Sequence, residues 1–140
     1  YLDKVPGRRR INISSRVGER QALTSTGLGK ALILDHPRRY WIDRFAADQA
    51  TGAPVADQHL WLDRMDGYVA AGRAFDLEEN EDQIRCVAAP IRDAGHMIVG
   101  AISVSSAAQY MNDERMTALT DTVLDTARAI SRELGWVPPG

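Results

Sequence analysis

The fold is decided by residues 83–106, QIRCVAAPIRDAGHMIVGAISVSS. Residues 84–91 and 97–105 are runs of β-branched and small side chains that have the length of strands. Between them, the sequence RDAGH at 92–96 supplies the Asp and Gly that turns favour. The stretch therefore predicts a β-hairpin, and the other elements can be placed around it.

One face of this hairpin is small and polar. Side chains alternate across a strand, so Cys86 and Ala88 share a face of the first strand. On the second strand, one face carries Val99, Ala101, Ser103 and Ser105, and the opposite, apolar face carries Ile98, Gly100, Ile102 and Val104. Strands buried on both faces usually carry Val, Ile or Leu on both. The serines and the cysteine therefore need an explanation.

Two explanations of the small face stay open at this point. In the first, the face is the floor of a pocket, where the hydroxyls of Ser103 and Ser105 meet a small polar ligand. In the second, the small side chains allow a helix to approach the sheet closely.

Length and composition describe one ordinary globular domain. The 140 residues, 44% hydrophobic and 26% charged, are enough for one core and hardly enough for two. The net charge of −2 leaves no basic surface for nucleic acid. The single cysteine excludes an internal disulfide, and no apolar run is long enough to cross a membrane. We expect a cytoplasmic protein without a membrane partner and, because the chain begins Tyr-Leu-Asp, a further domain upstream.

A hydroxyl-rich segment precedes the first predicted helix. In LTSTGLGKALIL, residues 23–34, apolar side chains recur at helical spacing after the Ser and Thr residues. Free backbone N–H groups and the positive end of the helix dipole make such a first turn suited to a carboxylate or phosphate. A plain helix N-cap explains the same pattern. Both interpretations stay open.

The remaining elements follow in a regular order. Alternation and a Pro-Gly turn predict two antiparallel strands, 1–5 and 8–17, with a solvated basic run at 8–10. Apolar spacing and caps predict three helices: 37–47, 57–71 and a long one that Asn112 caps and Gly135 ends. A short extended piece at 73–76 leads into an acidic loop, which is interpreted as solvated. This order favours an α+β fold in which helices cover an antiparallel sheet.

The residues suited to catalysis or metal binding form no recognisable set. The three histidines, His36, His59 and His96, lack metal-binding spacing, and the acidic segment lacks the EF-hand pattern. Cys86 lies between apolar neighbours in mid-strand, which is typical of a buried structural thiol. We expect no enzyme activity, no metal and no cofactor.

A series of segments runs through the chain in the order YLDKV, SRVGER, LTSTGLGKALIL, GRAFDLEE, IRCVAAPIRD, GAISVS and a last helix ending ELG. This series resembles the effector-binding domain of IclR-type transcriptional regulators. The resemblance covers nearly the whole chain, and the combination of TGLGKA, RCVAAPI and AISVS is specific.

The resemblance implies a GAF-like, ligand-sensing α+β domain over residues 1–140, which follows a winged helix-turn-helix domain absent from this chain. It also implies a homodimer or tetramer, in which a small organic effector alters the affinity for operator DNA, through repression or activation. The implied pocket lies between the helix start and the sheet. With Thr26 from the hydroxyl-rich segment, the candidate effector-binding residues are Thr26, Gly27, Leu28, Asp76, Cys86, Ser103 and Ser105.

The chemistry of these residues favours a hydroxy acid or sugar acid as the effector. Helix-start N–H groups and the two serines would bind a carboxylate, and Asp76 would accept a hydrogen bond from a ligand hydroxyl. Two departures from the family pattern, Ser106-Ala107 in place of Gly-Pro and Gln21 in place of an apolar residue, argue against the family's best-known effectors.

Two other functions are kept as alternatives. One is a small hydrolase or redox enzyme that uses Cys86, for which rapid alkylation of the thiol is expected. The other is a dimerisation module with a vestigial pocket, for which the small residues serve close packing and no cavity is expected.

Overall fold

The computed structural model describes residues 1–11 and 13–140, and a three-stranded antiparallel sheet in the order β1-β2-β3 lies at its centre. The strands are β1 (Ala74–Leu77), β2 (Ile84–Arg92) and β3 (Ile98–Ala107). The predicted hairpin is confirmed as β2 and β3, and the short extended piece is the edge strand β1.

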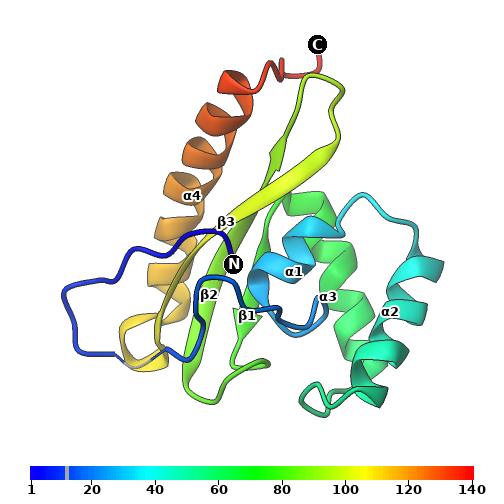
Figure 1. The fold of residues 1–140 in the computed structure, drawn as a ribbon, viewed down its shortest axis with the longest axis vertical. Helices are drawn as coiled ribbons and strands as arrows, with labels where there is room; N and C mark the ends of the chain where they lie inside the picture. The colour runs from blue at the N-terminus through cyan, green and yellow to red at the C-terminus, as the bar shows by residue number, and fades with distance from the viewer. Residues whose placement is uncertain (12) are drawn as a thin grey trace.

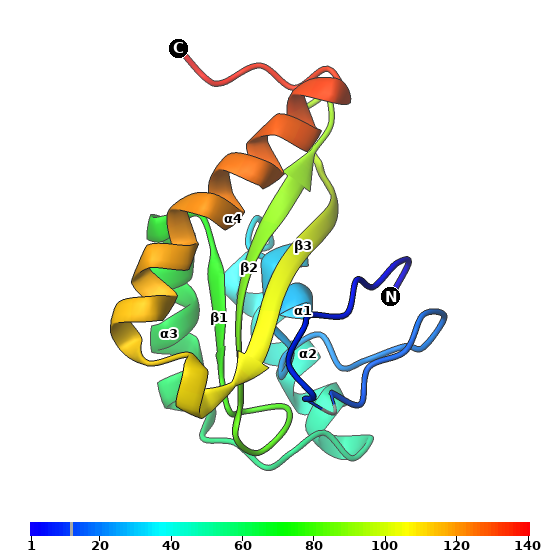
Figure 2. The same ribbon diagram turned by 90° about the vertical axis from the view of Figure 1, so that its left-hand side faces the viewer.

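Helices cover both faces of the sheet. Three of them, α1 (Gly27–Leu32), α2 (Arg38–Ala50) and α3 (Gln58–Ala71), lie on one side, and α4 (Asp113–Glu133) lies on the other (Figure 1). A short 3-10 turn, Ala108–Tyr110, connects β3 to α4. In the turned view α4 runs obliquely along the sheet (Figure 2). The predicted α+β fold with a helix-covered antiparallel sheet is confirmed.

The alternation of β2 divides the hydrophobic core in two. Cys86 and Ala88 face the first cluster, which contains the predicted stripe of α3: Trp61, Met65 and Tyr68. Val87 and Ala89 face the second cluster, where α4 contributes Met116, Val123 and Ala127. Leu134 was expected on the α4 stripe but is exposed, because the helix ends at Glu133.

A bulge in β3 corrects the predicted faces of the hairpin. Gly100 pairs with Ile91, but Arg92 pairs with Ile98, so Val99 is an extra residue in β3. An extra residue reverses the alternation beyond it. Ile98 was expected on the apolar face with Ile102, and it packs instead against the first cluster, on the Cys86 side.

The prediction of strands over 1–5 and 8–17 is wrong for the residues that the structure describes, and Asn12 lies outside them. The apolar side chains of this segment have no sheet face to cover, and Leu2 and Val5 are 98% and 88% exposed. Local contacts hold the segment, such as the Lys4 ammonium donating to the Ser15 carbonyl at 2.7 Å. A regular ladder needs an apolar face that it can bury, and alternation alone does not supply one.

The helix ends follow their capping residues. Asp57 caps α3 by accepting from the Leu60 N–H at 2.9 Å, and Gly72 ends the helix in the left-handed region at φ 70°. Pro37 is the N-cap of α2 and not its first helical residue, and this helix runs to Ala50, three residues beyond the predicted end at 47. The first helix is shorter than predicted and ends at Leu32.

Two glycines allow α1 to pack closely. A Cβ on Gly27 would lie 2.7 Å from the Cys86 Sγ, so this glycine lets the helix touch β2. A Cβ on Gly29 would overlap the backbone of Leu23, which cannot move away as a flexible side chain could. Close packing therefore requires both residues.

We expect Gly29→Ala to destabilise the domain by about 3 kcal/mol, because the added methyl group overpacks a backbone contact. Urea unfolding measures the change. Gly67→Ala is the matched control, since nothing lies within 4 Å of a Cβ there. Gly67 lies inside α3, where alanine is favoured by about 0.5–1 kcal/mol. Similar stabilities for the two variants would contradict this account.

Candidate functional site

One cavity brings all the predicted site residues together. It lies between the start of α1, β3 and the N-terminal segment, and its volume is about 30 Å³. Such a space exceeds what one water needs, roughly 10–15 Å³, and suits a ligand of a few non-hydrogen atoms. All seven candidate residues from the sequence analysis line it: Thr26, Gly27, Leu28, Asp76, Cys86, Ser103 and Ser105.

Other lining residues were missed by the sequence analysis. They come from the N-terminal segment, from the loop after β1 and from the start of β2: Tyr1, Ile13, Ser14, Ser15, Asn80, Glu81 and Ile84. Gln21, which the sequence analysis placed at a position of the family pattern, lines the cavity as well. Only a contact between distant segments brings them to the cavity, as when the Ser14 hydroxyl donates to Glu81 at 3.1 Å. No local sequence signal marks such contacts.

Close packing and open space occur at different residues of the small hairpin face. Close packing accounts for Cys86 and Ala88, because Gly27 of α1 lies directly against them. The cavity accounts for Ser103 and Ser105, which pair with Ala88 and Cys86 across the hairpin and face the open space. Ser103 is half-buried and Ser105 is exposed, so a ligand can reach both hydroxyls.

Thr26 lies at the cavity, but its hydroxyl is committed to the fold. It accepts from the Gly29 N–H at 3.0 Å and donates to the Ala22 carbonyl at 2.8 Å. The plain N-cap interpretation of this segment is therefore confirmed. At six residues, α1 is too short to carry an anion site on its dipole alone.

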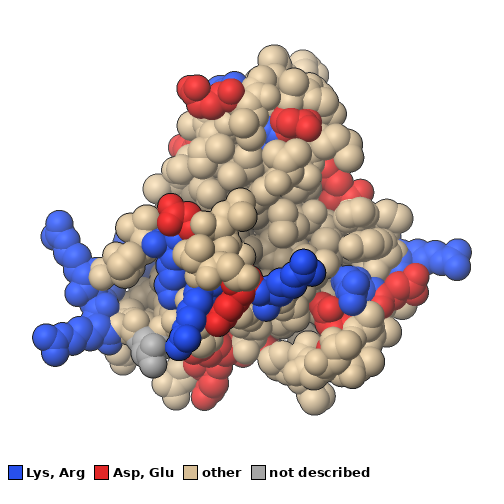
Figure 3. All heavy atoms as spheres, viewed as in Figure 1, with Lys and Arg blue, Asp and Glu red and all other residues tan. Residues whose placement is uncertain are grey.

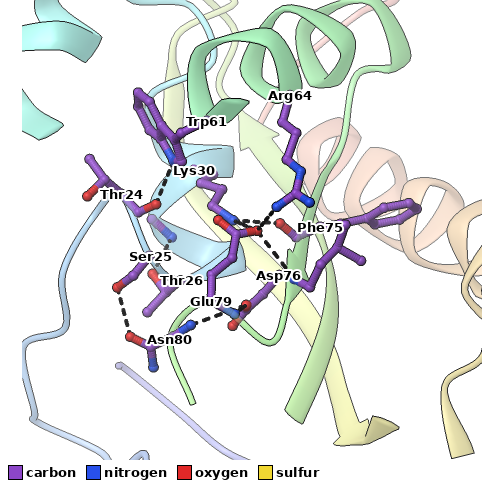
Figure 4. Close-up of polar contacts among 12 residues, drawn as sticks. Thr24, Ser25, Thr26, Lys30, Trp61, Arg64, Phe75, Asp76, Glu79 and Asn80 are labelled. Atoms are coloured by element: carbon purple, nitrogen blue, oxygen red, sulfur yellow. Dashed lines mark hydrogen bonds and ion pairs between the residues drawn. The ribbon is translucent and has the colours of Figure 1, made fainter. Parts of the chain in front are cut away.

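The rest of the hydroxyl-rich segment is also anchored. The Thr24 hydroxyl donates to Asp48 at 2.9 Å, and the Trp61 indole N–H donates to the Thr24 carbonyl at 2.7 Å. The Ser25 hydroxyl donates to the Asn80 Oδ1 at 2.8 Å (Figure 4). These bonds hold the entry to α1 against α2, α3 and the loop after β1.

Asp76 is a buried acid at the cavity wall, opposite Cys86 in the sheet. Its Oδ1 accepts from the Glu79 N–H at 2.8 Å and from the Asn80 N–H at 3.4 Å. Burial raises the pKa of Asp76 to about 6, although the Lys30 charge and these hydrogen bonds act in the opposite direction. A neighbouring ligand hydroxyl would find a strong acceptor here.

Cys86 has the environment of a structural thiol. Burial raises its pKa, and the neighbouring hydroxyls of Ser105 and Ser103 offset this only in part. The thiol is therefore protonated at neutral pH, whereas a nucleophilic cysteine needs a depressed pKa.

Lys30 does not line the cavity but holds the loop that does, and the sequence analysis missed it. Its side chain is 0% exposed, and its Nζ donates to the Phe75 carbonyl at 2.8 Å and pairs with Glu79 at 2.8 Å (Figure 4). The Glu79 carboxylate also lies 3.5 Å from Arg64. A lysine inside the apolar run GLGKALIL was the signal that could have found it.

The prediction that the acidic loop is solvated is therefore wrong for Glu78 and Glu79, which form ion pairs. The Glu79 side chain is 13% exposed, because it compensates the buried charge of Lys30. Glu78 of the same loop, at a φ of 65°, pairs with Arg85 at 3.3 Å. Ion pairs fix this loop at the cavity wall.

The cavity wall and the outer surface differ in charge. The described residues that line the cavity include Asp76 and Glu81 but no Lys, Arg or His. On the face in view, basic and acidic side chains are interspersed and form no continuous basic surface (Figure 3). Residues 1–11 and 13–140 contain neither a cluster of three potential metal ligands nor a helix able to span a membrane.

Comparison with known proteins identifies the family. Residues 1–132 match the model of the bacterial transcriptional regulator IclR C-terminal domain. The chain therefore belongs to the IclR family of transcriptional regulators and corresponds to their C-terminal domain, as the sequence motifs predicted.

Individual relatives agree with this assignment. The uncharacterized HTH-type transcriptional regulator RhmR of Escherichia coli is 30% identical over 142 residues, which cover 99% of this chain and 55% of RhmR. The glycerol operon regulatory protein of Streptomyces coelicolor is 36% identical over 126 residues, covering 85% and 48% of the two chains. The crystal structure of Thermotoga maritima IclR has a TM-score of 0.81 at 27% identity, covering 96% and 56%.

Two consequences follow from these matches. The relatives are transcriptional regulators and not enzymes, so the prediction of no enzyme activity is confirmed, and the alternative of a Cys86-dependent enzyme is wrong. The chain spans about half the length of these relatives, which are 48–56% covered.

Replacing Lys30 tests the buried ion pair. We expect Lys30→Met to destabilise the domain by about 3 kcal/mol in urea unfolding, because it leaves Glu79 as a buried charge with weaker compensation. The double variant Lys30→Met/Glu79→Gln should recover part of this loss, since it removes both charges. The single variant Glu79→Gln completes the comparison. If the loss of unfolding free energy in the double variant equals the sum of the losses in the two single variants, the two charges are not coupled.

The pKa of Asp76 predicts a pH dependence of stability. A pKa of about 6, above the ordinary 3.8, means that the folded state binds the proton more tightly than the unfolded state. This contribution, about 2 kcal/mol, is present at pH 4 and is lost as the pH rises through 6. Asp76→Asn cannot titrate, so unfolding free energies of both proteins between pH 4 and 7.5 should diverge across this window. A constant difference would contradict the raised pKa.

Proposed function

We propose that residues 1–140 form the effector-binding domain of a transcriptional regulator, and that the cavity binds a small organic acid that carries a hydroxyl group. The observation that supports this most directly is the meeting of Asp76, Ser103 and Ser105 around one cavity. These residues come from two different strands, and each presents a hydrogen-bonding group to the same small space.

The polar groups suggest how such a ligand binds. The hydroxyls of Ser103 and Ser105 donate to the ligand carboxylate. One oxygen of Asp76 is occupied by the backbone N–H groups of Glu79 and Asn80, and the second accepts from the ligand hydroxyl. The cavity favours acids of two to four carbons, and a larger sugar acid requires the N-terminal segment to move aside.

Ligand binding is proposed to act on a winged helix-turn-helix domain upstream of this chain. The N-terminal segment, which leads toward that domain, contributes Tyr1 and residues 13–15 to the cavity wall. A ligand that contacts this segment can favour one of its positions, and with it one arrangement of the DNA-binding domains of a homodimer or tetramer. Such control requires unequal ligand affinity for the two arrangements.

The dimerisation module with a vestigial pocket is the weaker alternative. It explains Gly27, Cys86 and Ala88, which are packed together. It does not explain the hydroxyls of Ser103 and Ser105 beside an open space.

A thermal-shift screen tests the proposed function. The panel contains glyoxylate, pyruvate, lactate, glycerate, gluconate and aromatic acids, each at millimolar concentration. A ligand at 100 times its dissociation constant stabilises the domain by about 2.7 kcal/mol, which raises the melting temperature by several degrees. No shift with any of the acids would contradict an organic-acid effector.

The serines provide a matched pair of variants. We expect Ser103→Ala/Ser105→Ala to weaken binding of the acid found in the screen by about 1–3 kcal/mol, because ligand groups lose their partners. Isothermal titration calorimetry measures the affinity, and circular dichroism should show an unchanged fold. Ser106→Ala is the control, since Ser106 alternates to the other face of β3. Unchanged affinity in the double variant would remove both serines from the site.

A further inference from the structure

Asn80 lines the cavity although it belongs to the acidic loop after β1. Its Oδ1 accepts from the Ser25 hydroxyl at 2.8 Å, and its backbone N–H donates to Asp76 (Figure 4). Ser25 is itself buried. The amide oxygen is therefore used within the protein, and the Nδ2 group is the part that remains for a ligand.

The loop holds this amide in a fixed position. Glu79, directly before Asn80, is anchored to Lys30 at 2.8 Å and donates its N–H to Asp76 at 2.8 Å. The Asn80 side chain is held by Ser25 and its backbone by Asp76, so it loses little conformational freedom when a ligand binds, which favours selective recognition.

The charges around the cavity make this amide important. Among the described residues, the cavity wall has two acids, Asp76 and Glu81, and no cationic side chain. Lys30 lies behind the wall and is occupied by Glu79 and the Phe75 carbonyl. An anionic ligand must therefore be bound by neutral donors, which offset the repulsion from the acids.

Several neutral donors near the cavity are already engaged. The Thr26 hydroxyl donates to Ala22, and the Gln21 amide donates to Glu19 at 3.3 Å. The lining side chains also offer the hydroxyls of Ser103 and Ser105 and, as a nitrogen donor, the Asn80 Nδ2.

We propose that Asn80 is a specificity-determining residue, whose amide N–H groups bind the ligand carboxylate and so select an acid over an uncharged molecule of the same skeleton. This inference rests on the proposed function, because it concerns the ligand of the same cavity. It assigns a role to a residue of the loop after β1, between the acids Glu79 and Glu81.

Asn80→Asp is the sharpest test. Aspartate has the same shape and keeps an oxygen for the Ser25 hydroxyl, but it replaces the Nδ2 donor with a negative charge. We measure by calorimetry the affinities of wild type and variant for lactate, glycerate and gluconate, and for glycerol, the uncharged counterpart of glycerate. Affinity for the acids should fall at least tenfold, and affinity for glycerol should fall less than twofold.

Two further variants serve as controls. Gln83→Glu adds the same charge next to this loop, at an exposed residue outside the cavity lining, and should leave acid binding within twofold. Asn80→Leu removes the donor without adding a charge and should weaken acid binding about threefold to tenfold. It also keeps the test valid if circular dichroism shows that the Asn80→Asp variant does not fold.

The outcomes separate the two hypotheses. If wild type binds none of the three acids, the proposed organic-acid function fails, and this inference fails with it. If wild type binds an acid and both Asn80 variants bind it equally well, only the inference about Asn80 fails. A loss of acid and glycerol binding by equal factors also overturns it, because Asn80 would then support the cavity without discriminating charge.

Discussion

The ion pair between Lys30 and Glu79 joins two of the parts of the chain that form the cavity. Lys30 belongs to α1, and Glu79 belongs to the loop that follows β1. Burying an ammonium group is costly unless its charge and its hydrogens are satisfied, and here Glu79 and the Phe75 carbonyl satisfy them. This requirement places the loop against α1. Asn80, next to Glu79 in this loop, and Asp76, near the end of β1, both lie at the cavity wall.

The cavity also depends on the close contact of α1 with β2. Gly27 lies against Cys86, so the helix start and the sheet meet there without a gap. The two serines lie on the neighbouring strand β3, where the space opens. The small side chains of β2 therefore pack against α1, whereas the small side chains of β3 border the open space. The two sets lie on one face of the sheet and differ in their distance from α1.

Membership of the IclR family gives this arrangement a physiological setting. The relatives are transcriptional regulators of about twice the length of this chain. A domain that binds a small molecule can bias the arrangement of other domains only if it binds that molecule unequally in the two states. In the proposed function the N-terminal segment transmits this bias, because it lines the cavity while Leu2 and Val5 stay exposed.

The sequence by itself determined the elements and the core. Strand alternation, caps such as Asp57 and the apolar stripe of α3 act over a few residues, so local chemistry was enough to predict them. Family motifs pointed to six candidate residues and the hydroxyl-rich segment to a seventh, Thr26, and all seven line one cavity. Alternation failed in residues 1–11 and 13–17, where no apolar face was available, and at Ile98, where a bulge reversed the faces. Only the tertiary structure decided which polar groups are free for a ligand. The Thr26 hydroxyl is consumed by a cap, Glu79 is buried by Lys30, and Asn80 is brought to the wall by Ser25, because each depends on a partner distant in the fold or on the local backbone geometry.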